Sequence, residues 1–111
     1  MIKVITLKTF RKAMKPLHKR YPNILKDVTK LIALLTDNPT LGNDLGDGFY
    51  KIRMAISDKK TGKSGGARVM TYTTEHNSET DTTTVKLILI YDKSDTSSVS
   101  KQDLLDLLEY E

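Results

Sequence analysis

The chain has 111 residues, 38% of them hydrophobic and 29% charged, with no cysteine and a formal net charge of +4. This length predicts one domain, residues 1–111, whose core can fold without a metal or a disulfide. The lack of cysteine excludes disulfide scaffolds, thiolate zinc sites and cysteine nucleophiles. No apolar run approaches the roughly 20 residues of a membrane helix, and residues 1–10 lack the apolar centre of a signal peptide. We therefore expect a cytoplasmic protein with no membrane partner.

The first predicted elements are a strand and two helices. Residues 2–7 are short and rich in β-branched side chains, which predicts a strand. From Thr9 the apolar residues follow helical spacing, and Pro16 is expected to kink or restart this helix because it lacks an N–H. Asn23 is the expected N-cap of a second helix, which ends before Pro39. Two helices with so short a break indicate a helical hairpin.

A loop and a strand follow the helices. Residues 40–48 contain three glycines, which predicts a turn-rich loop without regular structure. Residues 49–57 alternate, which predicts a strand. One face carries Tyr50, Ile52, Met54 and Ile56, and the other carries Phe49, Lys51, Arg53 and Ala55.

The last elements are two strands and a helix. Residues 67–74 and 84–91 indicate strands joined by a polar hairpin loop, and Ser100 with Asp103 resembles a capping box before a short C-terminal helix. Helices followed by strands indicate the α+β class. We expect the helical hairpin to pack on one face of a four-stranded antiparallel sheet, which leaves the other face free to bind a partner.

The charge is unevenly distributed along the chain. Residues 1–70 hold 15 Lys and Arg against 5 Asp and Glu, whereas residues 71–111 hold 3 against 9. Such polarity favours a polyanion, above all a nucleic acid, as a partner of the basic part. The alternative is a solvated lysine-rich surface of the kind found on many small proteins.

Two familiar motifs are excluded by their surroundings. The segment Thr61-Gly62-Lys63-Ser64 resembles a phosphate-binding loop, but Ser57 occupies the position of its first glycine and a strand, not a helix, is expected after it. His18 and His76 do not have the spacing of metal ligands. We therefore expect neither a metal site nor a cofactor.

A largely cationic set on the predicted strands and their connections is the main candidate site. It comprises Lys51, Arg53, Lys63, Arg68, Tyr91 and Lys93. Metal-free RNA cleavage needs a base for the 2′-hydroxyl, fixed positive charge on the phosphate and a proton for the 5′-oxygen. Arginine stays protonated, so a lysine whose pKa is depressed by neighbouring arginines is the candidate base. The alternative is a set of ordinary exposed sheet residues.

Three ordered blocks resemble the RelE/HigB toxin family, closest to its HigB-like branch. They are residues 49–56 (FYKIRMAI), 62–69 (GKSGGARV) and 89–94 (LIYDKS). Shorter matches precede them at residues 19–22 (KRYP), 38–39 (NP) and 41–42 (LG). The resemblance covers about residues 8–108.

This resemblance implies a helical hairpin against a four-stranded antiparallel sheet. It implies a bacterial toxin–antitoxin toxin, an endoribonuclease that cuts mRNA in the ribosomal A site and stops translation. It also implies a cognate antitoxin, commonly a helix-turn-helix DNA-binding protein that represses its own operon. Operator DNA is then a partner only through the antitoxin.

Carried over by position, Lys51 and Arg53 match the basic pair of the family's central strand, and Arg68 and Lys93 match later basic positions. The best-known branch has a tyrosine near the start of the last helix, where this chain has Ser97-Ser98-Val99, so Tyr91 is the substitute. Asp92 would weaken RNA binding unless it pairs with a cation.

The resulting hypothesis assigns a role to each candidate. Arg53 and Arg68 clamp the scissile phosphate. Lys51 or Lys93 takes the 2′-hydroxyl proton, and the other lysine or Tyr91 protonates the leaving oxygen. The RNA backbone is held by Lys63 and by the amides of Gly65 and Gly66.

Three other functions fit the same scaffold. A ParE-like gyrase inhibitor would need no phosphate clamp. A plain RNA-binding module would show aromatic platforms, but aromatics are only 6% of this chain. A non-catalytic relative that only binds an antitoxin is the third.

Overall fold

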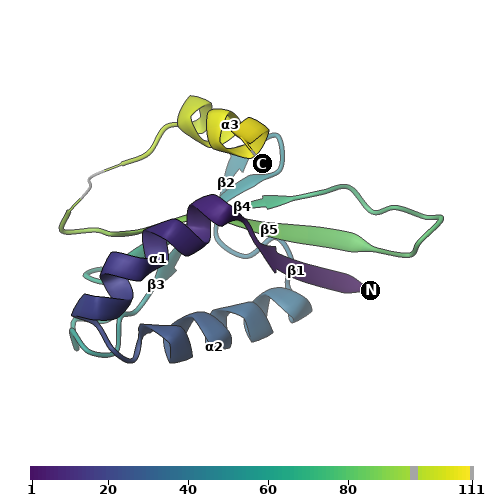
Figure 1. Cartoon of the computed structure of the whole chain (residues 1–111). Helices are drawn as coiled ribbons and strands as arrows, with labels where there is room; N and C mark the ends of the chain where they lie inside the picture. Colours follow the sequence, from purple (N-terminus) through teal and green to yellow (C-terminus); the bar gives the residue numbers. More distant parts are fainter. Residues whose placement is uncertain (96–97, 111) are drawn as a thin grey trace.

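The computed structural model describes residues 1–95 and 98–110, and it belongs to the α+β class, as the sequence predicts. The elements follow in chain order from N- to C-terminus (Figure 1). They are β1 (Ile2–Thr6), α1 (Lys8–Arg20), α2 (Ile24–Asp37), β2 (Asn43–Gly46), β3 (Phe49–Met54), β4 (Ala67–Thr73), β5 (Thr83–Asp92) and α3 (Lys101–Tyr110).

The sheet of the described residues has five strands and is mixed, so the expected four-stranded antiparallel sheet is wrong in number and direction. Its order is β1-β5-β4-β3-β2. The pairs from β5 to β2 are antiparallel, whereas β1 runs parallel to β5, with Val4 opposite Val85. Residue alternation identifies a strand but not its direction. The chain between β1 and β5 includes both helices and three strands, so it is long enough to bring β5 alongside β1 in the parallel direction.

The strand that the sequence did not predict is β2, which lies within the segment expected to be a loop. It pairs with β3 through Asn43, Asp44 and Gly46, with an irregularity in the register. The tight turn into β3 has positive φ at Gly46 (90°), Asp47 (56°) and Gly48 (88°). The glycines that suggested a loop therefore make a hairpin turn, because glycine adopts this backbone conformation without steric cost.

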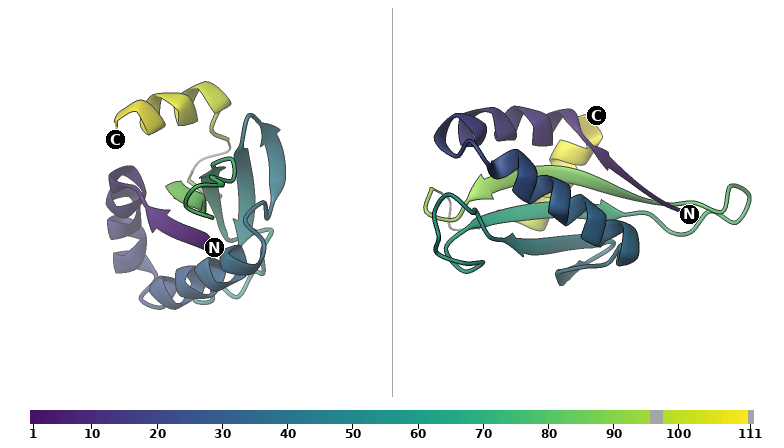
Figure 2. Two further views of the ribbon diagram at one scale, coloured as in Figure 1. Left: turned by 90° about the vertical axis from the view of Figure 1, so that its right-hand side faces the viewer. Right: turned by 90° about the horizontal axis from the view of Figure 1, so that it is seen from below.

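Helices α1 and α2 cover one face of the sheet (Figure 2), as expected for the hairpin. Phe10 and Leu17 of α1 and Leu35 of α2 are buried against Ile52 and Val69 of the sheet. Helix α1 continues through Pro16, so of the two expected outcomes, a kink or a restart, the restart does not occur. The lost hydrogen bond is tolerated because the buried stripe of α1 holds the helix on the sheet.

The opposite sheet face is not free, because α3 packs on part of it (Figure 2). Leu104 of α3 is fully buried in a second cluster that includes Phe49, Met70 and Ile88. The predicted capping box is confirmed: the Ser100 amide donates to the Asp103 carboxylate, and the Asp103 amide donates to the Ser100 hydroxyl, each over 3.1 Å.

The alternation predicted for β3 is confirmed where the strand exists. Ile52 and Met54 are buried on the α1–α2 side, whereas Phe49 belongs to the cluster under α3. Lys51 and Arg53 share the parity of Phe49, so they leave β3 on the α3 side of the sheet. Among the described residues, no helix is long and apolar enough to cross a membrane.

Candidate functional site

Three candidate residues form one row across the centre of the sheet. Arg53 of β3 is directly opposite Arg68 of β4, and Arg68 is directly opposite Tyr91 of β5. Residues opposite one another in a ladder point to the same face. The sheet register therefore brings together side chains that are 38 positions apart in the sequence, on the face that α3 only partly covers.

The two arginines of this row have different surroundings. Arg53 is exposed, and no described residue forms an ion pair with it. Arg68 is only 5% exposed, and its guanidinium donates to the carbonyl oxygens of Lys63 (3.0 Å), Ala67 (3.1 Å) and Ser64 (3.2 Å). The Arg68 side chain thus holds the preceding loop, and its positive charge lies beneath the site surface and does not project from it.

Tyr91 completes the row and is nearly buried, with 9% of its surface exposed. Burial raises the pKa of its hydroxyl, and the positive charge of Arg68 opposes this only in part. Tyr91 therefore stays protonated at neutral pH, so it can donate a proton but is a poor base.

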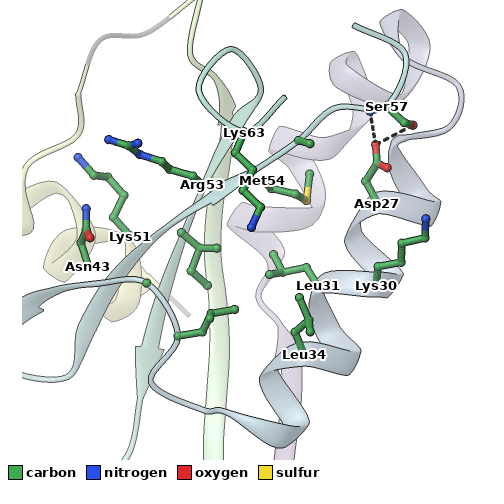
Figure 3. Close-up of a pocket in the computed structure, with 14 residues that line it drawn as sticks. Asp27, Lys30, Leu31, Leu34, Asn43, Lys51, Arg53, Met54, Ser57 and Lys63 are labelled. Carbon is green, nitrogen blue, oxygen red and sulfur yellow. Dashed lines mark hydrogen bonds between the residues drawn. The ribbon is translucent and has the colours of Figure 1, made fainter. Parts of the chain in front are cut away.

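The candidate lysines lie on either side of the row. Lys51 is opposite Met70, in the middle of β4. At the start of β4, the main-chain N–H of Lys93 donates to the carbonyl oxygen of Gly66, the residue before the strand (3.1 Å). From ordinary strand spacings, their Cα atoms are roughly 16 Å apart. Figure 3 shows Lys51 and Arg53 pointing to the side of β3 that faces away from α2. Lys63 extends from the loop across β3, closer to α2.

The two glycines before β4 have structural reasons to be glycine. A Cβ on Gly66 would lie 2.1 Å from the carbonyl oxygen of Met54, so β4 can approach the end of β3 only without a side chain there. A Cβ on Gly65 would meet the side chain of Thr61 at 2.6 Å. The Gly66 amide donates to the Lys63 carbonyl (3.4 Å), so this amide is already engaged in a turn.

A buried carboxylate joins the ends of several elements on the other side of the sheet, and sequence reasoning did not find this cluster. The Asp92 carboxylate accepts from the Tyr21 hydroxyl (2.6 Å), the Lys59 ammonium (3.0 Å), the Arg20 guanidinium (3.2 Å), and the Ser94 hydroxyl and amide. Asp92 is therefore paired with Lys59 and Arg20. From the sequence, an unpaired Asp92 was expected to weaken RNA binding, and this pairing removes that objection. No sequence spacing relates positions 20, 59 and 92, so only the fold reveals the cluster.

The pKa of Asp92 follows from these partners. Burial alone would raise it, but hydrogen bonds from Tyr21, Ser94 and Lys59 outweigh burial and hold the pKa well below its usual range. Asp92 is thus ionised at neutral pH. It ties α1 to the loop after β3, whose later residues carry Lys63.

The remaining predicted features lie elsewhere. Asn23 occupies the N-cap position of α2, but its side-chain amide donates to Asp58 (2.8 Å) and not to the helix. His76 contacts Asp81 (3.0 Å) in the hairpin between β4 and β5. Within the described ranges no group of three or more His, Asp or Glu side chains is arranged to hold a metal ion. Of Ser97-Ser98-Val99, Ser97 lies outside the described residues.

Comparison with known proteins finds no protein-family model and no curated protein sequence that matches this chain. The resemblance to RelE/HigB toxins therefore depends on the short sequence blocks alone.

Proposed function

We propose that this chain is the toxin of a toxin–antitoxin pair and cleaves mRNA on the ribosome without a metal ion. The observation that carries the proposal is the row of Arg53, Arg68 and Tyr91 on one sheet face, with Lys51 and Lys93 on either side. The RelE/HigB-like blocks contain all five positions. Cleavage by this chemistry yields a 2′,3′-cyclic phosphate and a 5′-hydroxyl.

The flanking lysines suit in-line attack by a 2′-hydroxyl. In such a displacement the attacking and leaving oxygens lie on opposite sides of the phosphorus, so the base and the acid must also be on opposite sides. Lys51 and Lys93 are on opposite sides of the arginine row. One accepts the 2′-hydroxyl proton, and the other, or Tyr91, protonates the 5′-oxygen.

The surroundings of the arginines refine the sequence hypothesis. Arg53 is exposed and is the residue that contacts the phosphate. Arg68 supports the site as a positioning residue, because its guanidinium donates to two carbonyls of the preceding loop and to one at the start of β4, and its charge adds to the potential below the phosphate. Lys63 and the Gly65 amide remain candidates for holding the RNA backbone, whereas Gly66 shapes the loop.

The test is inducible expression of the wild type and Arg53→Ala, with mRNA 5′ ends mapped soon after induction. We expect growth arrest and new cuts in translated messages for the wild type only. Lys12→Ala, which removes an exposed cation from α1, is the matched control and should cut like the wild type. Cleavage by purified protein and ribosomes should persist in a chelator.

Other outcomes would identify a different function. If Arg53→Ala arrests growth as the wild type does while mRNA stays intact, the row is not a nuclease site. Gyrase-dependent DNA damage would then point to a ParE-like toxin. Loss of cleavage in chelator would contradict the metal-free mechanism.

A further inference from the structure

The outer edge of β3 is only half paired. Strand β2 pairs with β3 as far as Lys51, whereas β4 pairs with all six residues of β3 on the other side. The Lys51 carbonyl lies on the β2 side, 2.6 Å from the position of a Cβ on Gly42. Main-chain groups alternate between the two sides of a strand, so the N–H and C=O of Arg53 also point outward. No described residue bonds to them.

A groove runs between this open edge and α2, and Figure 3 shows both of its walls. Its volume is about 540 Å³. The apolar lining includes Leu31 and Leu34 of α2 together with Ile52 and Met54 of β3. Leu34 is 55% exposed and extends this apolar lining to the surface, so that a partner can cover it.

The charges around the groove are mainly positive. Its lining includes four cations, namely Lys30, Lys51, Arg53 and Lys63, and the side chains of Lys51 and Arg53 leave β3 on the face away from α2. Asp27 is the one carboxylate among the lining residues that the structure describes, and it accepts from the Ser57 amide (3.0 Å) and hydroxyl (3.2 Å). The groove therefore favours an anionic occupant.

The geometry of the edge defines the occupant further. In a strand added beside β3, the residue opposite Arg53 would point to the same face of the sheet as Arg53. The residues before and after it in that strand would point to the groove face, beside Leu34. Acidic residues fit the first position and apolar residues fit the second. None of the described residues that line the groove has an aromatic side chain on which an RNA base could stack.

From these observations we infer that the groove between α2 and β3 binds an extended segment of a partner protein that alternates acidic and apolar residues and adds as a sixth strand. Main-chain bonds to Arg53 supply part of the affinity, and the alternating side chains supply the specificity. This inference holds whether or not the chain cuts RNA. A bound segment covers Lys51 and Arg53, so it excludes any polyanion from them.

The direct test is amide exchange by NMR on ¹⁵N-labelled protein with a synthetic peptide of about seven residues that alternates glutamate and valine. We expect exchange at the Arg53 amide to slow at least about tenfold in the complex, as for a newly formed ladder bond. The amides of Ile52 and Met54 face β4 and should not change. A peptide of the same composition with its glutamates and valines in separate blocks is the control.

Two exposed leucines of α2 make a matched pair of variants. Leu34→Glu places a carboxylate in the groove and should weaken peptide binding at least about tenfold. Leu25→Glu alters a similarly exposed leucine (49%) that lines a different hollow, beside α1, and should leave the affinity unchanged. Arg53→Pro should bind more weakly than Arg53→Ala, because both lose the charge but only proline loses the outward N–H.

Three results would overturn the inference. The blocked peptide could bind as well as the alternating one, or the Arg53 amide could exchange unchanged in the complex. A uridine oligonucleotide could perturb the Leu34 methyl groups when the peptide does not, which would make the groove an RNA surface. Failure of the mRNA-cleavage experiment has no bearing on any of these measurements, so the two proposals are tested separately.

Discussion

The Asp92 cluster and the exposed edge of β3 are two charged regions of one sheet, and they differ in how their charges are satisfied. The Asp92 carboxylate is fully buried and accepts from four different side chains. Lys51 and Arg53 reach solvent, and no described residue forms an ion pair with either. The first arrangement stabilises the fold, and the second leaves charges available to a partner. Substitutions in the two regions should therefore affect different properties.

The largest expected effect is on stability, from Asp92→Asn. The change leaves Lys59 and Arg20 without their buried partner, and breaking a buried ion pair in this way costs about 3–5 kcal/mol. Both cations keep some contact with water, with 18% and 46% of their side chains exposed, so we expect the lower end, about 3 kcal/mol. Urea unfolding measures it.

Asp95→Asn is the matched control, because Asp95 also pairs with Arg20 but is half exposed. This substitution should cost less than about 1 kcal/mol. Equal losses for Asp92→Asn and Asp95→Asn would mean that burial does not distinguish these two carboxylates.

Acid should weaken the same cluster. The pKa of Asp92 is lowered by folding from an unfolded value near 3.9, so its contribution to stability is complete well above that pH. The contribution is lost as pH falls below about 4 toward the folded-state pKa. The difference in unfolding free energy between wild type and Asp92→Asn should therefore shrink from pH 7 to pH 3. A constant difference would contradict the assignment of the depressed pKa to Asp92.

A smaller effect is expected in the loop that Arg68 holds. Gly66→Ala forces the Met54 main chain to move, which costs about 1–3 kcal/mol. Gly65→Ala meets only the Thr61 side chain, which can rotate away, so it should cost less. Thermal unfolding of both variants compares their losses of stability. A larger loss of stability for Gly65→Ala would show that the close approach of β3 and β4 is not what most requires glycine in this loop.

The smallest change in stability is expected at the exposed edge. Arg53→Ala and Lys51→Ala should alter the unfolding free energy by no more than about 0.5 kcal/mol, because neither residue has a described ion-pair partner. Both should nevertheless reduce RNA cleavage under the proposed function. A large loss of stability in Arg53→Ala would show that Arg53, like Arg68, serves the fold.

The predicted features that hold are those encoded by neighbouring residues. The alternation from Phe49 to Met54 assigned Ile52 and Met54 to the core because the side-chain period of a strand is two. The capping box of Ser100 and Asp103 needs only residues three apart. Both patterns are local, and the structure confirms both.

The predictions that fail depend on contacts between distant residues. The glycines of residues 40–48 indicated a loop, but β3 supplies the partner that makes Asn43–Gly46 a strand. The sheet face opposite the α1–α2 hairpin was expected to be free, but Leu104 of α3 is buried on it.

By itself, the sequence determined the α+β class, the position of most helices and strands, and the side of β3 on which Lys51 and Arg53 lie. Hydrophobic periodicity and capping are properties of short segments, which explains that success. Only the tertiary structure decided which cations are exposed and which are held. That distinction depends on burial and on partners such as Tyr21 and Lys59, which are brought to Asp92 only when the chain folds.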